Sequence, residues 1–365
     1  MSVERDPVEH GLEARLAAAR QAGGRADSRL TGSIDDFFLA DDARLDERMR
    51  ATVAQLLGGI VRSIETDIRR HAARVLSSGG ADRRAEALLR GHDDVVDRLS
   101  RAGLLRDRQL MDELIARVRG DIIAAALPID RDGPDDGSIL LRLADSDDGV
   151  VAVAARTLLS AEVRRRAAIH GDAAMTGDVS AELHHRLIWW IAATIREAIV
   201  ACEGDDAATD RAIVAAAQRS LAAHDEGDRV EAVAMRLAQA IGARADELAP
   251  LLIDCLRDRR LILFIACLGR ALDMDYDSTR AIVIEPEGDR LWLALRALDC
   301  DRATIARIGL SLADADPRRD LERFADEIDA LAAIPVDVAR SALAPLTLHH
   351  DLRLAIDALA RKTQR

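Results

Sequence analysis

The sequence predicts an all-α fold, and two features of its composition point that way. Aromatic residues make up only 2% of the 365 residues, whereas alanine, leucine, arginine and aspartate dominate. This composition favours close-packed helices and is a poor one for β-sheets. The apolar fraction of 49% is ample for a buried core, and apolar side chains recur at helical spacing along much of the chain.

The first third of the chain predicts a helical bundle behind a polar lead-in. Residues 1–34 are polar and contain Gly23, Gly24 and Gly32, so we expect a flexible lead-in. From Leu45 to Leu76 the apolar residues follow one stripe of a long helix. Such a helix needs a partner along its length, from this chain or from a second copy. A second copy would pair through Val53, Leu56, Ile60, Ile64 and Ile68.

Further helical segments at 81–99 and 106–127 complete this bundle, which we place at 35–130. The stretch IDRDGPDDGS that begins at Ile129 is rich in Asp, Gly and Pro, which is typical of a linker. We therefore predict a domain boundary there and a second domain over 136–365.

The second domain carries signs of a helical repeat. Ile139 to Leu159 reads as two apolar helices around an Asp-rich turn, whose Asp side chains are natural helix caps. RALDMD at 270–275 and RALDCD at 296–301 are two copies 26 residues apart, each between apolar helices. This period fits two short helices with their turns. The apolar run from Leu261 to Leu268 is then a helix buried between its neighbours.

These residues resemble a known family. The run LLIDCLRDRRLILFIACLGRALDMD and the stretch GDRLWLALRALDCDRATIARIGLSLADAD are similar to the bacterial family catalogued as domain of unknown function 2336. The long helix LDERMRATVAQLLGGIVRSIETDIRRHAARVL resembles the segment that often precedes this domain. The resemblance implies stacked HEAT-like helical hairpins and a place in bacterial signalling, but it carries no catalytic residues.

Charge and composition limit the classes of function and the cellular locations that we expect. The net charge of −13 disfavours nucleic-acid binding, and stretches such as EVRRRAA at 162–168 and DLERFADEID at 320–329 read as solvated, salt-bridged helix faces. The four cysteines have no metal-site spacing, so we expect no metal and free thiols in a reducing compartment. The acidic start and the short apolar runs predict a cytoplasmic protein without a membrane span.

The sequence lacks the glycine-rich phosphate loops, nucleophile elbows and zinc motifs of common enzymes, so we expect neither catalysis nor a cofactor. The segment AELHHRLIWWIAATIREA at 181–198 offers candidate partner contacts, because tryptophan is enriched at interface hot spots. These contacts are His185, Arg186, Trp189 and Trp190. We therefore predict a protein–protein interaction module or scaffold.

An alternative function is histidine phosphotransfer at His71, which lies among Arg69, Arg70 and Arg74 on the long helix. Cationic neighbours are suited to receive a phosphoryl group. The position of His71 between Ile68 and Val75 favours instead a histidine packed in a core or an interface.

Overall fold

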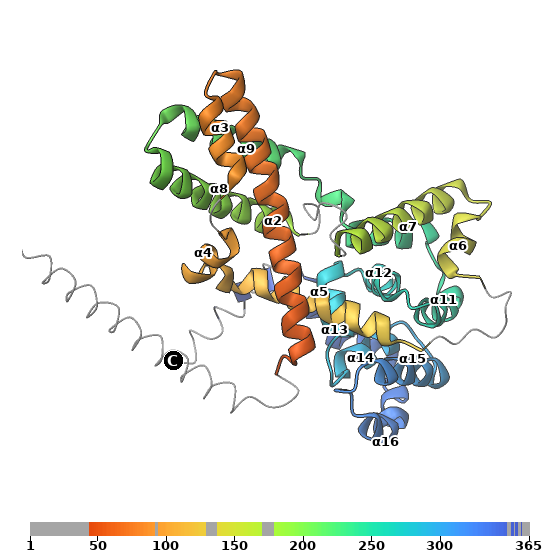
Figure 1. Cartoon of the computed structure of the whole chain (residues 1–365). Helices are drawn as coiled ribbons and strands as arrows, with labels where there is room; N and C mark the ends of the chain where they lie inside the picture. The colour runs from red at the N-terminus through yellow and green to blue at the C-terminus, as the bar shows by residue number, and fades with distance from the viewer. Residues whose placement is uncertain are drawn as a thin grey trace, which may run out of the picture. The chain divides into compact units, whose positions relative to one another are not determined.

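The computed structural model describes residues 44–91, 94–128, 137–169 and 179–348, together with 352, 353, 355, 356 and 359. Every regular element within these ranges is a helix, which confirms the all-α prediction (Figure 1). The lead-in predicted for residues 1–34 lies outside the described residues. Among the described helices no single one is long and apolar enough to cross a bilayer. One pair of consecutive helices, Leu321–Ala332 and Val336–Thr347, is long and apolar enough when taken together, but the two are bent by 114°.

The helices fall into two sets that each interleave distant parts of the chain. The first set consists of α2 (Glu47–Ser78), α3 (Asp82–Arg90), α4 (Val95–Arg101), α8 (Ala181–Glu203) and α9 (Ala207–Ala223). The second consists of α5 (Arg108–Ala126), α6 (Ile139–Ala144), α7 (Gly149–Ile169), α10 (Val230–Ile241), α11 (Ala245–Arg257), α12 (Leu261–Leu272), α13 (Tyr276–Val283), α14 (Asp289–Ala297), α15 (Arg302–Ala315), α16 (Leu321–Ala332) and α17 (Val336–Leu343). Short 3₁₀ turns lie at Leu104–Arg106, Glu226–Asp228 and Ala344–Thr347.

This interleaving differs from the predicted domains at 35–130 and 136–365. Helix α8, which follows the expected boundary, packs against α3 and α4, and Arg98 pairs with Glu197 across that contact at 2.8 Å. Helix α5, which precedes the boundary, packs against α12, α13 and α15. Residues 48–365 accordingly form one compact unit rather than two.

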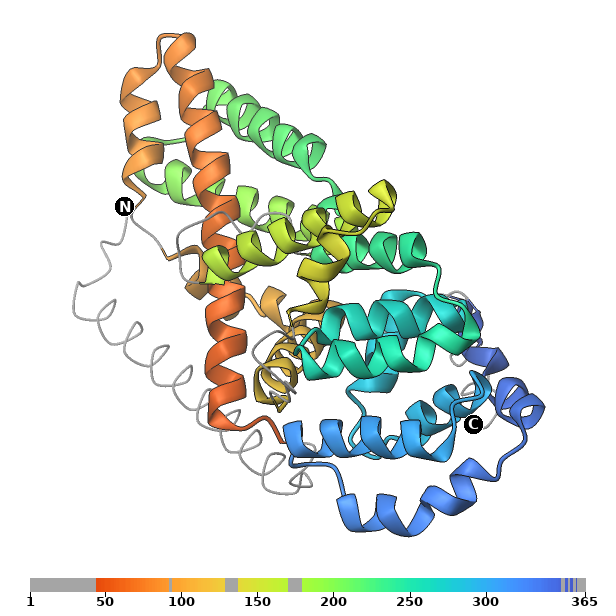
Figure 2. The ribbon, with the colours of Figure 1, turned by 90° about the vertical axis from the view of Figure 1, so that its right-hand side faces the viewer.

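Helix α2 runs without interruption from Glu47 to Ser78, close to the predicted 45–76, and lies beside α3 in both views (Figure 1, Figure 2). Its apolar stripe is covered within the chain. The five side chains expected at a dimer contact are between 0 and 7% exposed, namely Val53, Leu56, Ile60, Ile64 and Ile68. These side chains thus belong to the core of a single chain, and the dimer contact predicted for this stripe stays a prediction.

Helix α12 is buried on all sides, as its sequence predicts. Residues 263–268 are between 0 and 4% exposed, and the helix packs against α10, α11, α13 and α5. A helix that is apolar all round can be stable in water only in such surroundings.

The two RALD-x-D segments form the same turn. Asp273 and Asp299 each end a helix with a left-handed backbone, at φ 56° and 59°. In each turn the following amide N–H reaches back to a helix carbonyl, from Met274 to Gly269 at 2.9 Å and from Cys300 to Leu295 at 3.0 Å. The last aspartate then caps the next helix, since Asp275 accepts from the amide of Ser278 and Asp301 from that of Thr304. The local repeat is thus present in the structure, whereas the HEAT-like order of stacking stays a prediction.

A buried ion cluster joins α5, α7 and α10, and we define it by Glu113, Asp121, Arg165, Arg229 and Glu231. Glu231 lies 3.6 Å from Arg165 and 3.7 Å from Arg229. Arg229 also pairs with Glu113 at 3.0 Å, and Arg165 pairs closely with Asp121. The stretch EVRRRAA is therefore not a solvated face throughout, because Glu162 and Arg165 point inward and are buried.

The pKa values of the two glutamates in the cluster are shifted in opposite directions. Burial alone would raise the pKa of Glu231, but Arg165, Arg229 and Arg117 outweigh it and hold that pKa below its usual value. Burial raises the pKa of Glu113, and the nearby Arg229 only partly offsets this effect. Glu231 is thus the anion that the surrounding arginines hold in its charged form.

We expect Glu231→Gln to lower the free energy of unfolding by about 2–3 kcal/mol near neutral pH, because the buried guanidinium groups of Arg165 and Arg229 lose a shared counter-charge. The other carboxylates paired with these two arginines remain in the variant. The loss should shrink as the pH falls through the depressed pKa of Glu231, since the wild-type carboxyl is then neutral as well. Urea unfolding at several pH values measures both effects.

Glu197→Gln is the matched control, because this side chain is 69% exposed in its pair with Arg98. It should cost less than about 1 kcal/mol. Equal losses in the two variants would mean that the buried ion cluster does not hold the helices together.

Candidate functional site

The α6–α7 hairpin carries the most apolar exposed helix face of the second set of helices. Its turn follows the prediction, since the Asp148 carboxylate accepts from the amides of Val150 at 2.8 Å and Val151 at 3.3 Å. Arg156 closes the hairpin by donating to the carbonyl oxygen of Ala144, the last residue of α6, at 2.7 Å. Both ends of the turn are therefore fixed by side chains.

One side of α7 packs inward and the other does not. Val151, Ala155 and Leu158 are buried, and α7 packs there against α6 and α10. On the outer side Val150 is 69%, Val153 62% and Val163 63% exposed. An apolar side chain that stays in water forgoes roughly 1.5–3 kcal/mol of burial.

We define the α7 face as Val150, Val153, Thr157, Ser160, Val163 and Arg164. The spacing of these residues places them along one side of the helix, and all six are exposed. The hydroxyl groups of Thr157 and Ser160 donate to the carbonyl oxygens of Val153 at 2.8 Å and Arg156 at 3.0 Å. Because their hydrogen bonds are made within the helix, these two residues can be covered without losing a donor contact to water.

The charges around the α7 face are separated along its length. Asp145, Asp147 and Asp148 are exposed at its amino-terminal end. At the other end Arg166 lies 3.6 Å from Glu162, a carboxylate that Arg260 holds more closely. Within the part of the chain that the structure describes, no carboxylate pairs with Arg164. The face thus ends in a positive charge that no described carboxylate neutralises.

Arg186, one of the predicted contact residues, is already paired within the chain. Its guanidinium donates to Asp107 at 2.8 Å, to Glu182 at 3.1 Å and closely to Gln109. Asp107 also caps the start of α5 by accepting from the amide of Leu110. Arg186 therefore ties α8 to the beginning of α5.

The other predicted contact residues lie on two sides of α8. The indole N–H of Trp189 donates to Nε2 of His185 at 3.2 Å, and their rings meet edge to face. His185 is exposed, whereas Trp189 and Trp190 are both half-buried. The structure brings His185 and Trp189 together, and a role of these residues in partner binding stays a prediction.

His184 and His224 form a stacked pair that sequence reasoning did not find. Their ring centroids are 4.1 Å apart with an interplanar angle of 16°. Burial, together with His224, lowers the pKa of His184 to about 4, so the imidazole is neutral at physiological pH. No sequence motif marks the pair, because His184 and His224 are far apart in the sequence.

His71 lies at the edge of the apolar stripe of α2 rather than within it. The side chain is half-buried, while Ile68 is fully buried and Val75 is 36% exposed. Burial lowers the pKa of His71, and the cations of Arg219 on α9 and Arg74 on α2 lower it further against the opposing effect of Asp67. The ring is therefore neutral beside two arginines.

Comparisons of this chain with family models, with curated proteins and with solved structures found no match. The resemblance to domain of unknown function 2336 therefore stays a prediction. Over the described ranges, no three His, Cys, Asp or Glu side chains gather where they could hold a metal ion. The residues of the α7 face, all at ordinary helix positions, carry no sequence motif that marks them as a site.

We expect the stability of the protein to fall between about pH 6.5 and about pH 4 because of His184. The folded-state pKa is about 4 against 6.5 for an unperturbed histidine, so in this range the unfolded chain binds the proton more readily. The stability that His184 contributes is fully present above its pKa in the unfolded chain and is lost as the pH falls towards its pKa in the folded protein. We expect this loss to be about 2 kcal/mol after allowance for solvent screening.

Urea unfolding of wild type, His184→Leu and His185→Leu measures this effect. His184→Leu should flatten the pH dependence, and His185→Leu, at the exposed neighbour, should leave it unchanged. An unaltered slope in His184→Leu would rule out the stacked pair as its source.

Proposed function

We propose that this chain is a non-enzymatic protein–protein interaction module that binds its partner through the α7 face. The observation that supports this most is the row of valines at Val150, Val153 and Val163, each more than 60% exposed on one helix. Apolar side chains exposed along one face of a helix are the kind that a partner helix covers.

The charges favour one type of partner, an amphipathic helix with an apolar side and acidic residues near one end. Its apolar side would cover Val150 and Val153 at helical spacing, as in helix pairing. Its carboxylates would neutralise Arg164, and the aspartates at the start of α7 would repel the same carboxylates. The two charged ends thereby define a single orientation for the bound helix.

We place this module in the cytoplasm, and the sequence resemblance implies a place in bacterial signalling. All four cysteines are free, and Cys255, Cys267 and Cys300 are buried. Free thiols agree with a reducing compartment.

The proposal is tested by capturing tagged protein from its own cells in three forms, namely wild type, Val153→Glu and Val338→Glu. Val338 is the matched control because it is 53% exposed on α17, away from the α7 face. We expect a partner that wild type and Val338→Glu retain in near-stoichiometric amount and that Val153→Glu loses. Affinity measured with the purified partner should fall at least about tenfold in Val153→Glu, since a charge replaces a buried contact.

A Trp189→Ala variant separates the two candidate surfaces. Loss of the partner in Trp189→Ala with retention in Val153→Glu would move the interface to α8. Retention of the same partner in both variants, with both folded, would contradict the α7 face and the α8 residues alike.

The alternative proposal is a phosphotransfer component that uses His71. It is supported by a neutral imidazole, which is the nucleophilic form, beside Arg74 and Arg219. Incubation with a low-molecular-weight phosphodonor should then leave acid-labile phosphate on the wild-type protein and none on His71→Ala. Equal labelling of the two proteins would exclude His71.

A further inference from the structure

Three arginines gather where α5 meets the turn that follows α15, and we call them the arginine cluster. Arg119 belongs to α5, which packs against α13 and α15, and Arg318 and Arg319 lie in the turn between α15 and α16. The two arginines of the turn reach the end of α13. Arg318 donates there to the carbonyl oxygen of Ile284 at 3.3 Å. Arg319 donates to the carbonyl oxygen of Val283 at 2.5 Å.

The positive charges of the arginine cluster are only partly neutralised. Within the described part of the chain, Asp316 is the one carboxylate that pairs with the cluster, and both its oxygens accept from Arg318, at 2.9 and 2.6 Å. Glu285 and Glu287 lie near Arg319 without an ion pair to it, and Glu285 is already paired elsewhere. Three cations and one directly paired carboxylate leave a surplus of two positive charges.

Several donor nitrogens of the arginine cluster are buried without an acceptor among the described residues. These are Nε of Arg119, Nη1 of Arg318, and both Nε and Nη1 of Arg319. Arg319 is only 8% exposed, and its guanidinium lies 5.9 Å from the ring centre of Trp292, a contact that favours the cation but supplies no hydrogen bond. Buried polar groups in folded proteins nearly always have a partner, so the cluster is suited to an acceptor from outside the chain.

The surroundings of the arginine cluster disfavour its positive charges. Burial and the neighbouring Arg318 lower the pKa of Arg119, against the opposing effect of Asp316. Burial also lowers the pKa of Arg319, and the nearby carboxylates offset this effect only in part. Arginine stays protonated in proteins, so each lowered pKa marks an unfavourable electrostatic energy that a bound anion would relieve.

We propose that the arginine cluster binds a phosphate group, which Arg119 and Arg318 hold while Arg319 supplies the third positive charge. Both Arg119 and Arg318 are half-buried, so an anion from solution can reach them. A phosphate group offers several acceptor oxygens and a charge of about −1.5 to −2 at neutral pH, which is close to the surplus charge of the cluster. Guanidinium groups bind phosphate through paired hydrogen bonds. The site shares no residue with the α7 face.

Inorganic phosphate is the first probe, and sodium chloride at equal ionic strength is its control. Titration calorimetry on the full chain at about pH 8 should show phosphate binding with a dissociation constant of about 1 mM or tighter. Phosphate should also raise the Tm, because a ligand of the folded chain stabilises it. Chloride should not reproduce this increase, since it only screens the charges.

Methyl phosphate distinguishes two sources of the phosphate group. Binding of both probes would assign the arginine cluster to a phosphate ester, whose substituent extends away from the site. Binding of inorganic phosphate alone would assign the cluster to the free ion. Either result supports a phosphate site.

Arg119→Gln separates binding from folding, because Arg119 forms no ion pair with a described residue. This variant should weaken phosphate binding at least about tenfold. Without phosphate its Tm should equal or exceed that of wild type, since a poorly neutralised cation has been removed. Arg119→Lys keeps the charge but loses the paired hydrogen bonds, so its affinity should lie between those of wild type and Arg119→Gln.

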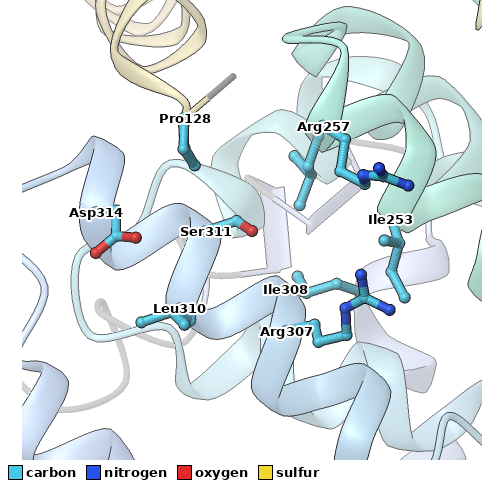
Figure 3. A pocket seen from close by; sticks show the side chains of 9 residues that line it. Pro128, Ile253, Arg257, Arg307, Ile308, Leu310, Ser311 and Asp314 are labelled. Atoms are coloured by element: carbon cyan, nitrogen blue, oxygen red, sulfur yellow. The ribbon is translucent and has the colours of Figure 1, made fainter. Parts of the chain in front are cut away.

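Arg307→Gln is the matched control. Like Arg119, Arg307 has no carboxylate partner among the described residues, but it lines a different part of the molecule. It lies at a cavity of about 390 Å³ between the end of α5, α11 and α15, which Pro128, Ile253 and Leu256 also line (Figure 3). Arg307→Gln should bind phosphate as wild type does.

Three outcomes would overturn the proposal. The first is equal phosphate affinity in Arg119→Gln and in wild type. The second is an equal loss of affinity in Arg307→Gln and Arg119→Gln, which would indicate general attraction to exposed arginines. The third is an increase in Tm with sodium chloride as large as that with phosphate, which would indicate screening rather than binding.

Discussion

The charge of Glu231 is the constraint on which the arrangement of the second set of helices depends. A carboxylate buried on α10 must be neutralised from outside its own helix, and Arg165 of α7 provides part of that neutralisation. Arg229 at the start of α10 provides another part and is itself held by Glu113 of α5. These contacts fix which side of α7 faces inward. The same rotation of the helix that buries Arg165 turns Arg164 and Val153 outward, so the core contact and the candidate interface have one cause.

Features that depend on neighbouring residues could be predicted from the sequence. The buried helix at Leu261–Leu272 follows from its nearly unbroken apolar run, because such a run has no face that favours water. The two RALD-x-D turns likewise repeat because the aspartates act locally. Asp273 and Asp299 take the left-handed conformation that ends a helix, and Asp275 and Asp301 cap the next one. In both cases the interacting groups lie within a few residues of each other.

Features that depend on distant partners could not be predicted in this way. Arg164 and Arg165 are adjacent and chemically identical, yet among the described residues only Arg165 meets carboxylates, from α5 and α10. The packing of α8 against α3 and α4 likewise involves pairs such as Arg98 with Glu197, which no sequence pattern predicts. The candidate site was missed for a related reason. The sequence of α7 is apolar on two sides, which predicts a helix buried on both. In the structure other helices cover one side of α7, and the valines on the other side are exposed.

Helix α5 has a further consequence, because it runs from the neighbourhood of the α7 face to a cavity between its own end, α11 and α15. Asp121 of α5 pairs with Arg165, next to the α7 face, and Pro128 at the end of the same helix forms a wall of the cavity. A rigid helix cannot shift at one end independently of the other. Thermodynamic linkage then sets a reciprocal condition on the molecule. Whatever factor a ligand at Pro128 would apply to the affinity for a partner on α7, that partner would apply to the affinity for the ligand.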